Sequence, residues 1–362
     1  MKILMIARST LFSSPGGDTT QIEMTAKYLR ELGVTVDIKL SNDSLAYDSY
    51  DILHFFNIIR PDDILPHVQQ TKVPYVISTI FVDYYEYEKN NRTGLLKVMN
   101  SVFDRDQIEY IKTLARSVKN GDKIKSSYYI RHGQRQSIHY LAKQSAMLLP
   151  NSHSEYQRFV NIYGINQRYQ KVVNAIDPAL FNNSIQPDPN YQDHVLCVGR
   201  IEGRKNQLNL IKALQGTDLK LTIIGKPSPN HLAYYQQCKE LAAAAGNVQF
   251  IDHINHHNLA TLYKAARVHV LPSWFETTGL SSLEAGVLDC NLVITRKGDT
   301  EEYFGDMAYY CEPDSVESIR EAVLRAWREP IHPQLKEYIL TNYTWQHAAQ
   351  QTLEAYRTVL SR

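Results

Sequence analysis

The stretch Val268-His-Val-Leu-Pro-Ser-Trp-Phe-Glu-Thr-Thr-Gly-Leu-Ser-Ser-Leu-Glu-Ala-Gly-Val-Leu288 predicts a strand, a turn and a helix in succession. The apolar run at 268–271 is typical of a buried strand, Pro272 opens the turn, and the helix is expected from about Gly279 or Leu280. A helix that follows a strand and a turn leaves several backbone N–H groups without partners, with the positive end of its dipole behind them. The stretch therefore predicts a phosphate-binding site.

Two glutamates stand eight positions apart in this stretch, Glu276 in the turn and Glu284 in the expected helix. Because a carboxylate beside an anion site weakens phosphate binding, the pair indicates hydrogen bonds to neutral hydroxyl groups, such as those of a sugar and a ribose, on either side of a diphosphate. Gly279 suits close approach of the backbone to a ligand. A structural interpretation is equally open, since Ser281-Ser-Leu-Glu284 fits a capping box and Glu276 fits a surface turn.

Strands and helices alternate along the chain. Expected strands lie at residues 2–7, 34–40, 51–56, 73–79, 146–152, 195–200, 219–224, 248–251, 268–271 and 292–295. Such alternation is typical of α/β proteins with parallel, doubly wound sheets, which bind ligands beyond the carboxyl ends of their strands. The chain has 362 residues, enough for two such domains with separate cores.

The first domain is expected at residues 1–185 and the second at 186–345, with the polar, proline-rich run 186–193 as the linker and a terminal helix at 346–362. A basic helical insertion is expected at about 84–145, since residues 89–143 include 12 Lys and Arg against 4 Asp and Glu, whereas the net charge of the chain is +1. Cations attract phosphates and anionic lipid surfaces, so the insertion either binds an acceptor and touches a membrane surface or is a solvated helical face.

The composition is that of a globular protein, with 43% hydrophobic and 21% charged residues, and excludes disordered and fibrous classes. The four cysteines have no Cys-x-x-Cys spacing, which favours a reduced, cytoplasmic compartment. The apolar run at 1–8 is too short for a signal peptide, and no run has the length of a membrane span. We expect no metal, because His253, His256 and His257 lack partners at ligand spacing, and no nucleic-acid partner.

Basic residues follow the first expected strand of the second domain. Arg200, Arg204 and Lys205 lie in the loop between that strand and the next helix. A guanidinium and an ammonium at the carboxyl end of a strand can hold a diphosphate and stabilise it as it leaves, although a surface cluster of basic residues is the alternative. In the first domain, Gly16 and Gly17 lie in the loop after the first strand, where they face the ligand or simply form a turn.

The pattern Ser273-x-x-Glu276-x-x-Gly279-Leu280-x-x-Leu283-Glu284-Ala285 resembles the Glu-x7-Glu signature of retaining family 4 glycosyltransferases, with Thr277-Thr278 where Gly-Phe is usual. Arg200 and Lys205 are similar in position to the Gly-Arg-x4-Lys motif of that family. The resemblance implies the GT-B fold, two Rossmann-like domains facing a central cleft, in which the terminal helix crosses back to the first domain.

The same resemblance implies a retaining, metal-independent transfer of a sugar from a nucleotide diphosphate sugar to an acceptor hydroxyl, without a further cofactor. Arg200 and Lys205 would stabilise the departing diphosphate, and Glu276 would hold hydroxyls of the transferred sugar. The residues expected at the donor are Gly16, Gly17, Gly225, His253, Ile254, Thr277, Thr278, Gly279, Leu280 and Glu284, the last of which binds the ribose.

The first domain departs from the family at one point. Many members have a histidine after the fourth strand in a Thr-x-His-like triplet, where this chain has Thr79-Ile80-Phe81. Asp83, His132 and His153 are candidates to compensate. Residues expected to bind the acceptor, a saccharide or lipid-linked saccharide, are Asp83, Tyr84 and Tyr85.

Three functions remain open on the sequence. The first is a retaining glycosyltransferase of bacterial-type polysaccharide or glycolipid assembly, cytoplasmic or peripheral at the cytoplasmic membrane face. The second is a non-catalytic subunit that binds a nucleotide sugar, prompted by the missing histidine, and the third is a nucleotide-sugar epimerase on the same fold. The metal-dependent GT-A class is disfavoured, because its Asp-x-Asp match, Asp104-Arg-Asp106, lies in a helical pattern rather than after a strand.

Overall fold

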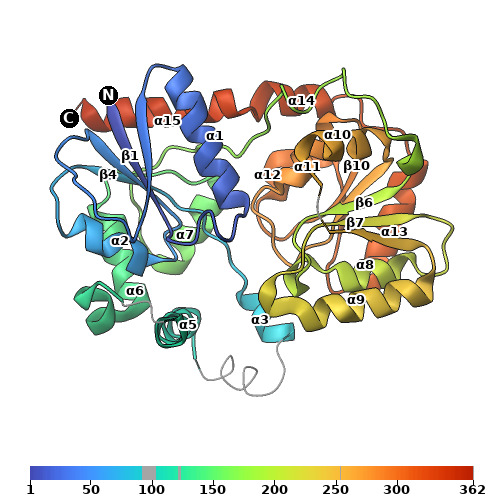
Figure 1. Ribbon diagram of the computed structural model, residues 1–362, viewed down its shortest axis with the longest axis horizontal. Helices are drawn as coiled ribbons and strands as arrows, with labels where there is room; N and C mark the ends of the chain where they lie inside the picture. Colours follow the sequence, from blue (N-terminus) through green and yellow to red (C-terminus); the bar gives the residue numbers. More distant parts are fainter. Residues whose placement is uncertain (92–102, 121–123, 253, 362) are drawn as a thin grey trace. The chain divides into compact units, whose positions relative to one another are not determined.

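The computed structural model describes residues 1–91, 103–120, 124–252 and 254–361 (Figure 1). Two compact units make up the chain. Unit 1 comprises Met1–Asn174 together with Trp345–Arg362, and unit 2 comprises Ala175–Thr344. The C-terminal helix therefore belongs to the same unit as the N-terminal strand.

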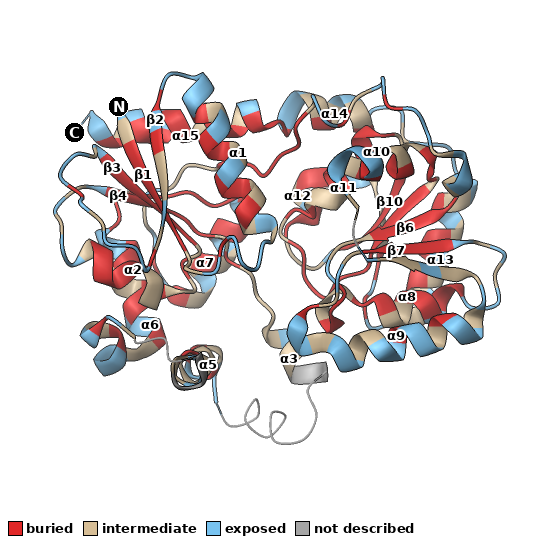
Figure 2. Cartoon of the chain, in the orientation of Figure 1, coloured by how far each residue is buried: buried red, intermediate tan, exposed pale blue. Residues whose placement is uncertain are grey.

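Unit 1 is built on a parallel sheet with the strand order β2-β1-β3-β4-β5. The strands are β1 (Lys2–Ala7), β2 (Thr35–Leu40), β3 (Ile52–Phe56), β4 (Tyr75–Ser78) and β5 (Met147–Leu148). The helices are α1 (Gly17–Glu31), α2 (Pro61–Val68), α3 (Tyr85–Asn91), α5 (Arg105–Asn120), α6 (Ser127–Gln144), α7 (His153–Tyr163) and α15 (Trp345–Leu360). Every residue of β3 and β4 is buried, so these strands are mostly apolar and do not alternate between apolar and polar residues (Figure 2).

Helices cover both faces of this sheet. Leu4, Leu53 and Phe55 pack in one core cluster with residues of α2, α6 and α7. Successive strand residues face opposite sides, so His54 lies on the other face, where its Nδ1 is 2.6 Å from the hydroxyl oxygen of Tyr356 in α15 and its Nε2 is 2.8 Å from Ser78 Oγ. The helix α15 also packs against α1. These contacts fix the end of the chain to the first sheet.

Unit 2 contains a second parallel sheet, with the order β11-β10-β9-β6-β7-β8. Its strands are β6 (Val195–Val198), β7 (Leu221–Ile224), β8 (Val248–Ile251), β9 (Val268–Leu271), β10 (Asn291–Thr295) and β11 (Tyr309–Cys311). Its helices are α8 (Gln207–Leu214), α9 (Leu232–Ala245), α10 (His256–Ala265), α11 (Leu280–Val287), α12 (Thr300–Phe304), α13 (Val316–Arg328) and α14 (Leu335–Asn342).

The order of strands reverses between β6 and β9. From β6 the chain adds β7 and β8 on one side, and it then crosses to add β9, β10 and β11 on the other. In doubly wound sheets the loops that follow the two strands at such a switch point diverge and leave room for a ligand at the carboxyl edge. The strand orders and parallel pairing confirm the predicted doubly wound α/β class.

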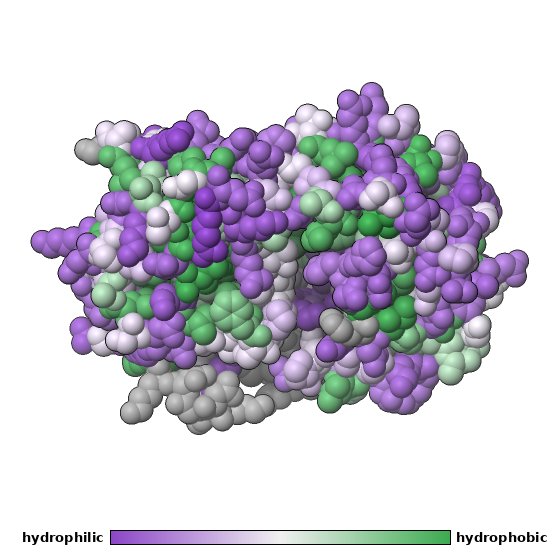
Figure 3. Space-filling model, turned by 45° about the horizontal axis from the view of Figure 1, so that its top comes forward, coloured by the Kyte–Doolittle hydropathy of each residue, from purple (hydrophilic) through white to green (hydrophobic). Residues whose placement is uncertain are grey.

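The surface carries both hydrophilic and hydrophobic residues. On the face drawn in Figure 3, hydrophilic residues are interspersed with smaller hydrophobic areas. Large exposed apolar side chains such as Phe12 and Leu232 belong to different elements, the loop after β1 and the start of α9. None of the helices in the described part of the chain is both long and apolar enough to cross a membrane.

Candidate functional site

The helix α11 begins one residue after a glycine in the left-handed region. Gly279 is its N-cap, with φ 70° and ψ 76°, and no side chain caps the helix. A Cβ at Gly279 would lie 3.1 Å from Ser282 Oγ and 3.3 Å from Leu271 Cδ2, in a conformation that side chains rarely adopt. The first turn of α11 therefore has no side-chain cap, a feature that helix N-termini need in order to bind an anion.

Glu276 is fixed through its backbone to the loop after β10. Its N–H donates to the carbonyl of Lys297 at 3.0 Å, and its carbonyl accepts from the N–H of Asp299 at 2.9 Å. The residue between them, Gly298, has φ 115°, and a Cβ there would lie 1.8 Å from the carbonyl oxygen of Glu276. Only glycine lets the two backbones approach this closely, and the result is a buried Glu276 in a defined position.

Lys205 forms an ion pair with Glu276, so the structure brings together two of the three residues expected to be catalytic. Lys205 lies in the loop after β6, in a 3-10 turn at Gly203–Lys205, and its side chain is 21% exposed against 8% for Glu276. Although 71 residues separate them, the two loops follow the adjacent strands β6 and β9. The carboxyl ends of adjacent parallel strands place both charges at one edge of the sheet.

Asn206 joins these two loops and was assigned no role from the sequence. Its Nδ2 donates to the carbonyls of Pro272 at 3.0 Å and Pro313 at 2.6 Å. The residue is buried, has φ 63°, and is the N-cap of α8. The N–H of Trp274 also donates to the carbonyl of Arg204 at 2.9 Å. The only sequence signal was an asparagine between a basic loop and a helix, which is common at helix caps.

The other basic residues of the loop after β6 differ in their surroundings. The side chain of Arg200 is exposed. The Nε of Arg204 donates to Glu202 Oε1 at 2.6 Å, and Glu202 is buried and also accepts from Ser228 Oγ at 3.1 Å. Burial alone would raise the pKa of the Glu202 carboxyl, but the Arg204 and Arg200 guanidiniums hold it below its ordinary value. Arg204 is thus engaged with Glu202, a pairing that no sequence pattern indicated.

Glu284 does not form a capping box. Because α11 begins at Leu280, Ser281 lies inside the helix rather than at its cap, and the carboxylate of Glu284 accepts instead from the hydroxyl of Tyr263 at 3.3 Å. The structural interpretation of Ser281 and Glu284 is therefore wrong. Burial raises the pKa of the Glu284 carboxyl to about 7.

Several buried polar atoms around this turn have no hydrogen-bond partner among the described residues. They are Ser273 Oγ, Thr278 Oγ1, Ser282 Oγ and both ring nitrogens of His269. Burial lowers the pKa of the His269 imidazole to about 3, with a smaller effect of the Lys205 charge, so this ring is neutral. Unpaired buried polar groups are uncommon in proteins, and here they lie on β9, on the turn after it and at the start of α11.

The remaining residues expected at the donor are distributed between the units. Gly225 follows β7 with φ 147°, and a Cβ there would lie 2.0 Å from the carbonyl oxygen of Gly199, so glycine is required where two loops meet. Thr277, Leu280 and Ile254 are half-buried in unit 2, and His253 lies outside the described residues. Gly16 and Gly17 belong to unit 1, as the N-cap and first residue of α1.

The candidate residues after β4 do not form one cluster. Asp83 pairs with Arg105 at 2.7 Å, and the Arg105 guanidinium lies 5.7 Å from the centre of the Tyr85 ring. Tyr84 directly precedes α3 and is half-buried. The His132 ring lies against Tyr128 in α6, with ring centres 4.2 Å apart. His153 Nδ1 is 3.0 Å from the hydroxyl oxygen of Tyr169.

Phe81 and the buried carboxylate of Glu155 hold the segment that follows β4 in place. Phe81 is buried against Phe159, with ring centres 5.6 Å apart. The carboxylate of Glu155 accepts from Thr79 Oγ1, from the N–H of Phe81 at 2.7 Å and from the N–H of Asn151 at 2.8 Å. Glu155 thereby fixes the segment that follows β4, a role that no local sequence pattern indicates.

Residues 181–342 match the protein family Glycosyl transferases group 1. The matched region lies within unit 2. An uncharacterized glycosyltransferase of Methanocaldococcus jannaschii is 29% identical over 177 residues, which are 46% of this chain and 45% of that protein. O-antigen chain mannosyltransferase B of Escherichia coli is 27% identical over 180 residues, 46% of each protein. The chain thus matches about half the length of these relatives.

Solved structures extend the likeness to the whole chain. Sucrose-phosphate synthase from Thermosynechococcus elongatus has a TM-score of 0.77 at 15% identity, covering 100% of this chain and 99% of that chain. HepE of Anabaena, in complex with UDP, has a TM-score of 0.71 at 14% identity, covering 99% of this chain and 100% of that chain. At these identities the likeness concerns the fold, and it confirms the predicted GT-B class.

Substituting Gly298→Ala tests whether the close approach to Glu276 positions the site. The new Cβ would overlap the Glu276 carbonyl oxygen, so we expect a loss of at least about 2 kcal/mol of stability from the left-handed backbone and the clash together. Gly216→Ala is the control, because Gly216 also has a positive φ but its Cβ would meet nothing within 4 Å. Equal drops in melting temperature for both variants would contradict this role of Gly298.

A Glu284→Gln variant tests the burial of the Glu284 carboxyl through the pH dependence of stability. Its folded pKa of about 7 exceeds the ordinary 4.5, so between these values the folded protein binds more protons than the unfolded chain, and wild-type stability falls as the pH rises. From pH 5 to pH 8 the variant should gain up to about 3 kcal/mol relative to wild type. Melting curves of an exposed control, Glu240→Gln, should show no such trend; a flat difference for Glu284→Gln would contradict the burial.

Proposed function

We propose that the protein is a retaining, metal-independent glycosyltransferase that moves a sugar from a nucleotide diphosphate sugar to an acceptor hydroxyl. The observation that carries the proposal is the Lys205–Glu276 ion pair at the carboxyl edge of the second sheet, beside the uncapped start of α11. One cation, one carboxylate and a helix N-terminus without a side-chain cap lie on a single edge and suit the parts of a phosphorylated sugar.

The diphosphate of the donor is assigned to Lys205, Arg200 and the amides around Thr278 to Leu280. An ammonium in a partly buried ion pair has donors to share, because it carries three N–H groups. Arg200 is exposed and brings a second positive charge to the same loop. Two cations and a helix N-terminus offset the charge of a diphosphate, which is the task that a divalent metal performs in other transferases.

The two glutamates are assigned to hydroxyl groups. Glu276 would accept from hydroxyls of the transferred sugar, and Glu284 would accept from the ribose. The hydroxyl of Tyr263 already donates to Glu284, which fixes the carboxyl in place. Hydroxyl donors favour the ionised form of a carboxyl, so donor binding would lower the raised pKa of Glu284.

The transfer itself forms a bond between the acceptor oxygen and the anomeric carbon of the sugar and breaks the bond from that carbon to the phosphate oxygen. The acceptor proton passes to the leaving phosphate, and the same-face attack retains the configuration of the sugar. Lys205 and Arg200 stabilise the negative charge that grows on the leaving group. Glu276 holds the sugar and is not the nucleophile.

The names of similar proteins support the donor and acceptor classes. One relative is a mannosyltransferase of O-antigen chains, and one structural neighbour was solved in complex with UDP. We therefore assign a sugar nucleotide as donor and a saccharide or lipid-linked saccharide as acceptor, in polysaccharide or glycolipid assembly. The products formed from the donor distinguish this proposal from the alternatives of a non-catalytic subunit and an epimerase.

Replacing Lys205 tests the donor site. Thermal shifts with UDP, GDP, dTDP, ADP and their sugars, in EDTA, should identify one nucleotide that stabilises the wild type, by about 2.7 kcal/mol at 100 times its dissociation constant. Lys205→Gln removes one charged contact to the diphosphate and should weaken that nucleotide at least about tenfold. The matched control is Lys264→Gln, since the Lys264 side chain on α10 is 23% exposed, close to the 21% of Lys205, and also forms an ion pair, with Asp289.

Two results would count against the proposal. Unchanged nucleotide binding by Lys205→Gln would remove the donor site from this edge. With the donor identified, binding of the nucleotide sugar without formation of any glycosylated or hydrolysed product, or recovery of an epimerised donor, would exclude the transferase reaction.

A further inference from the structure

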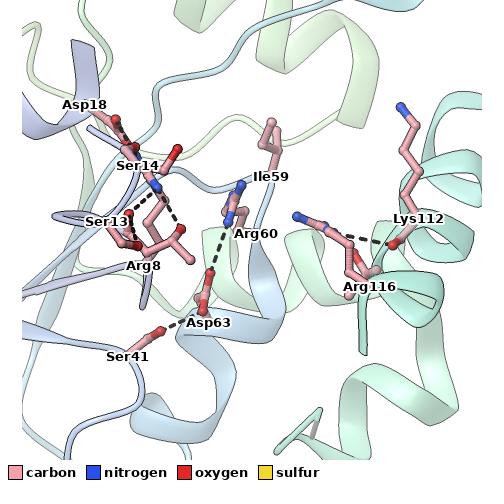
Figure 4. Close-up of polar contacts among 12 residues, drawn as sticks. Arg8, Ser13, Ser14, Asp18, Ser41, Ile59, Arg60, Asp63, Lys112 and Arg116 are labelled. Atoms are coloured by element: carbon pink, nitrogen blue, oxygen red, sulfur yellow. Dashed lines mark hydrogen bonds and ion pairs between the residues drawn. The ribbon is translucent and has the colours of Figure 1, made fainter. Parts of the chain in front are cut away.

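Three arginines gather at the carboxyl edge of the sheet in unit 1, and they differ in how their donors are used (Figure 4). Arg8, just after β1, uses all the N–H donors of its guanidinium. Its guanidinium donates to both carboxylate oxygens of Asp18, to Thr10 Oγ1 and to the carbonyls of Thr10 and Ser14, at distances of 2.6–3.1 Å. All five N–H groups of this side chain hold the loop between β1 and α1, so Arg8 has a structural role.

Arg60 lies at the end of the loop that follows β3 and is the N-cap of α2. Its guanidinium makes no hydrogen bond to any residue that the structure describes, and its contact is an ion pair to Asp63 with 3.9 Å between Nη1 and Oδ2. Asp63 itself accepts from Ser41 Oγ at 2.6 Å. The Arg60 side chain is 32% exposed, so its five donors are partly withdrawn from water without replacement partners.

Arg116 comes from a different element, the helix α5. Its Nη2 donates to Thr113 Oγ1 at 2.9 Å and its Nε to the carbonyl of Lys112 at 3.4 Å, which leaves further N–H groups of this exposed side chain without partners in the described part of the chain. In Figure 4 the guanidiniums of Arg60 and Arg116 point toward each other. Burial and, to a smaller degree, the charges of Arg116 and Arg8 lower the pKa of Arg60, so the two cations act on one another.

The loop that carries Arg60 is held rigidly from α6. Gln134 Nε2 donates to the carbonyl of Ile59 at 2.7 Å, and its Oε1 accepts from the hydroxyl of Tyr129, also at 2.7 Å. Tyr129 and Gln134 are both buried. Two facing guanidiniums on a fixed loop and a helix repel one another, and an anion between them would remove that repulsion.

Acidic residues beside Arg60 and Arg116 offset the positive charge of the two arginines only in part. Asp62 and Asp63 lie in the first turn of α2. Burial and the Asp63 charge raise the pKa of the Asp62 carboxyl to about 6, so this group is partly protonated near that pH and opposes an anion less than an ordinary aspartate. Lys112 is engaged with Glu88 and Glu109 and does not add to the pair.

We propose that Arg60 and Arg116 bind a phosphoryl group carried by the acceptor. Arginine forks fit the oxygens of a phosphate in two parallel hydrogen bonds each, and the nearby carboxyl of Asp62 offers a partner for an acceptor hydroxyl. The inference that the phosphate belongs to an acceptor rests on the proposed function, whereas the binding of a phosphate ester in unit 1 does not.

The test measures binding of phosphate esters in the Lys205→Gln background, which removes the donor-site cation. Glycerol 3-phosphate in calorimetry serves as the soluble probe, and sedimentation with phosphatidylcholine vesicles containing phosphatidic acid serves as the lipid probe. Arg60→Gln and Arg116→Gln should each weaken binding of at least one probe about tenfold or more. The control Arg131→Gln removes an exposed arginine of α6 from the same basic region and should have less than a twofold effect.

Each outcome decides the proposal. Arginine-dependent binding of glycerol 3-phosphate identifies a soluble phosphate ester, and arginine-dependent binding of the vesicles alone identifies a phospholipid head group; both support it. Equal binding by the Lys205→Gln protein with and without Arg60→Gln or Arg116→Gln, binding of neither probe, or an equal loss in Arg131→Gln overturns it. Because Arg116 is exposed, the Arg116→Gln protein can be tested even if Arg60→Gln lowers the stability of unit 1. If the proposed donor site is wrong, the nucleotide thermal shifts of wild type and Lys205→Gln will show it, independently of phosphate-ester binding.

Discussion

The ion pair between Lys205 and Glu276 depends on how two loops are held at the edge of a parallel sheet. Asn206 donates to the carbonyl of Pro272, which fixes the loop after β6 to the loop after β9, and the contact at Gly298 fixes Glu276 to the loop after β10. A partly buried ion pair gains little net stability, because the cost of desolvation offsets its attraction. Its value lies in presenting a cation and a carboxylate, already oriented, to a ligand that can use both.

Much of this site could be predicted from local sequence. The strand at 268–271 and the helix from Leu280 follow from apolar periodicity and from a glycine that suits a left-handed N-cap. The meeting of Lys205 with Glu276 follows from topology, since both follow strands of one doubly wound sheet. The capping-box interpretation of Glu284 failed because a short motif fits several helix registers, and the register is set by the conformation at Gly279.

The contacts that fix the site and the sheet of unit 1 could not be predicted, because their partners are distant in the chain. At the site, Asn206 meets Pro272 across 66 positions. His54 meets Tyr356 across 302 positions, and Glu155 accepts from residues 74 and 76 positions away. A buried histidine or glutamate in a sequence gives no sign of which donor it will meet. The same limit applies to Arg8 and Arg60, which look alike in the sequence, although Arg8 has all its donors engaged and Arg60 donates no hydrogen bond within the described part of the chain.

A crystal structure of the protein with the nucleotide sugar that it binds would test the central claim most directly. We expect the diphosphate between Lys205 Nζ and the first amides of α11, with a sugar hydroxyl within hydrogen-bond distance of Glu276 and the ribose at Glu284. A nucleotide bound elsewhere, with the Lys205–Glu276 pair untouched, would contradict the assignment of this edge as the donor site.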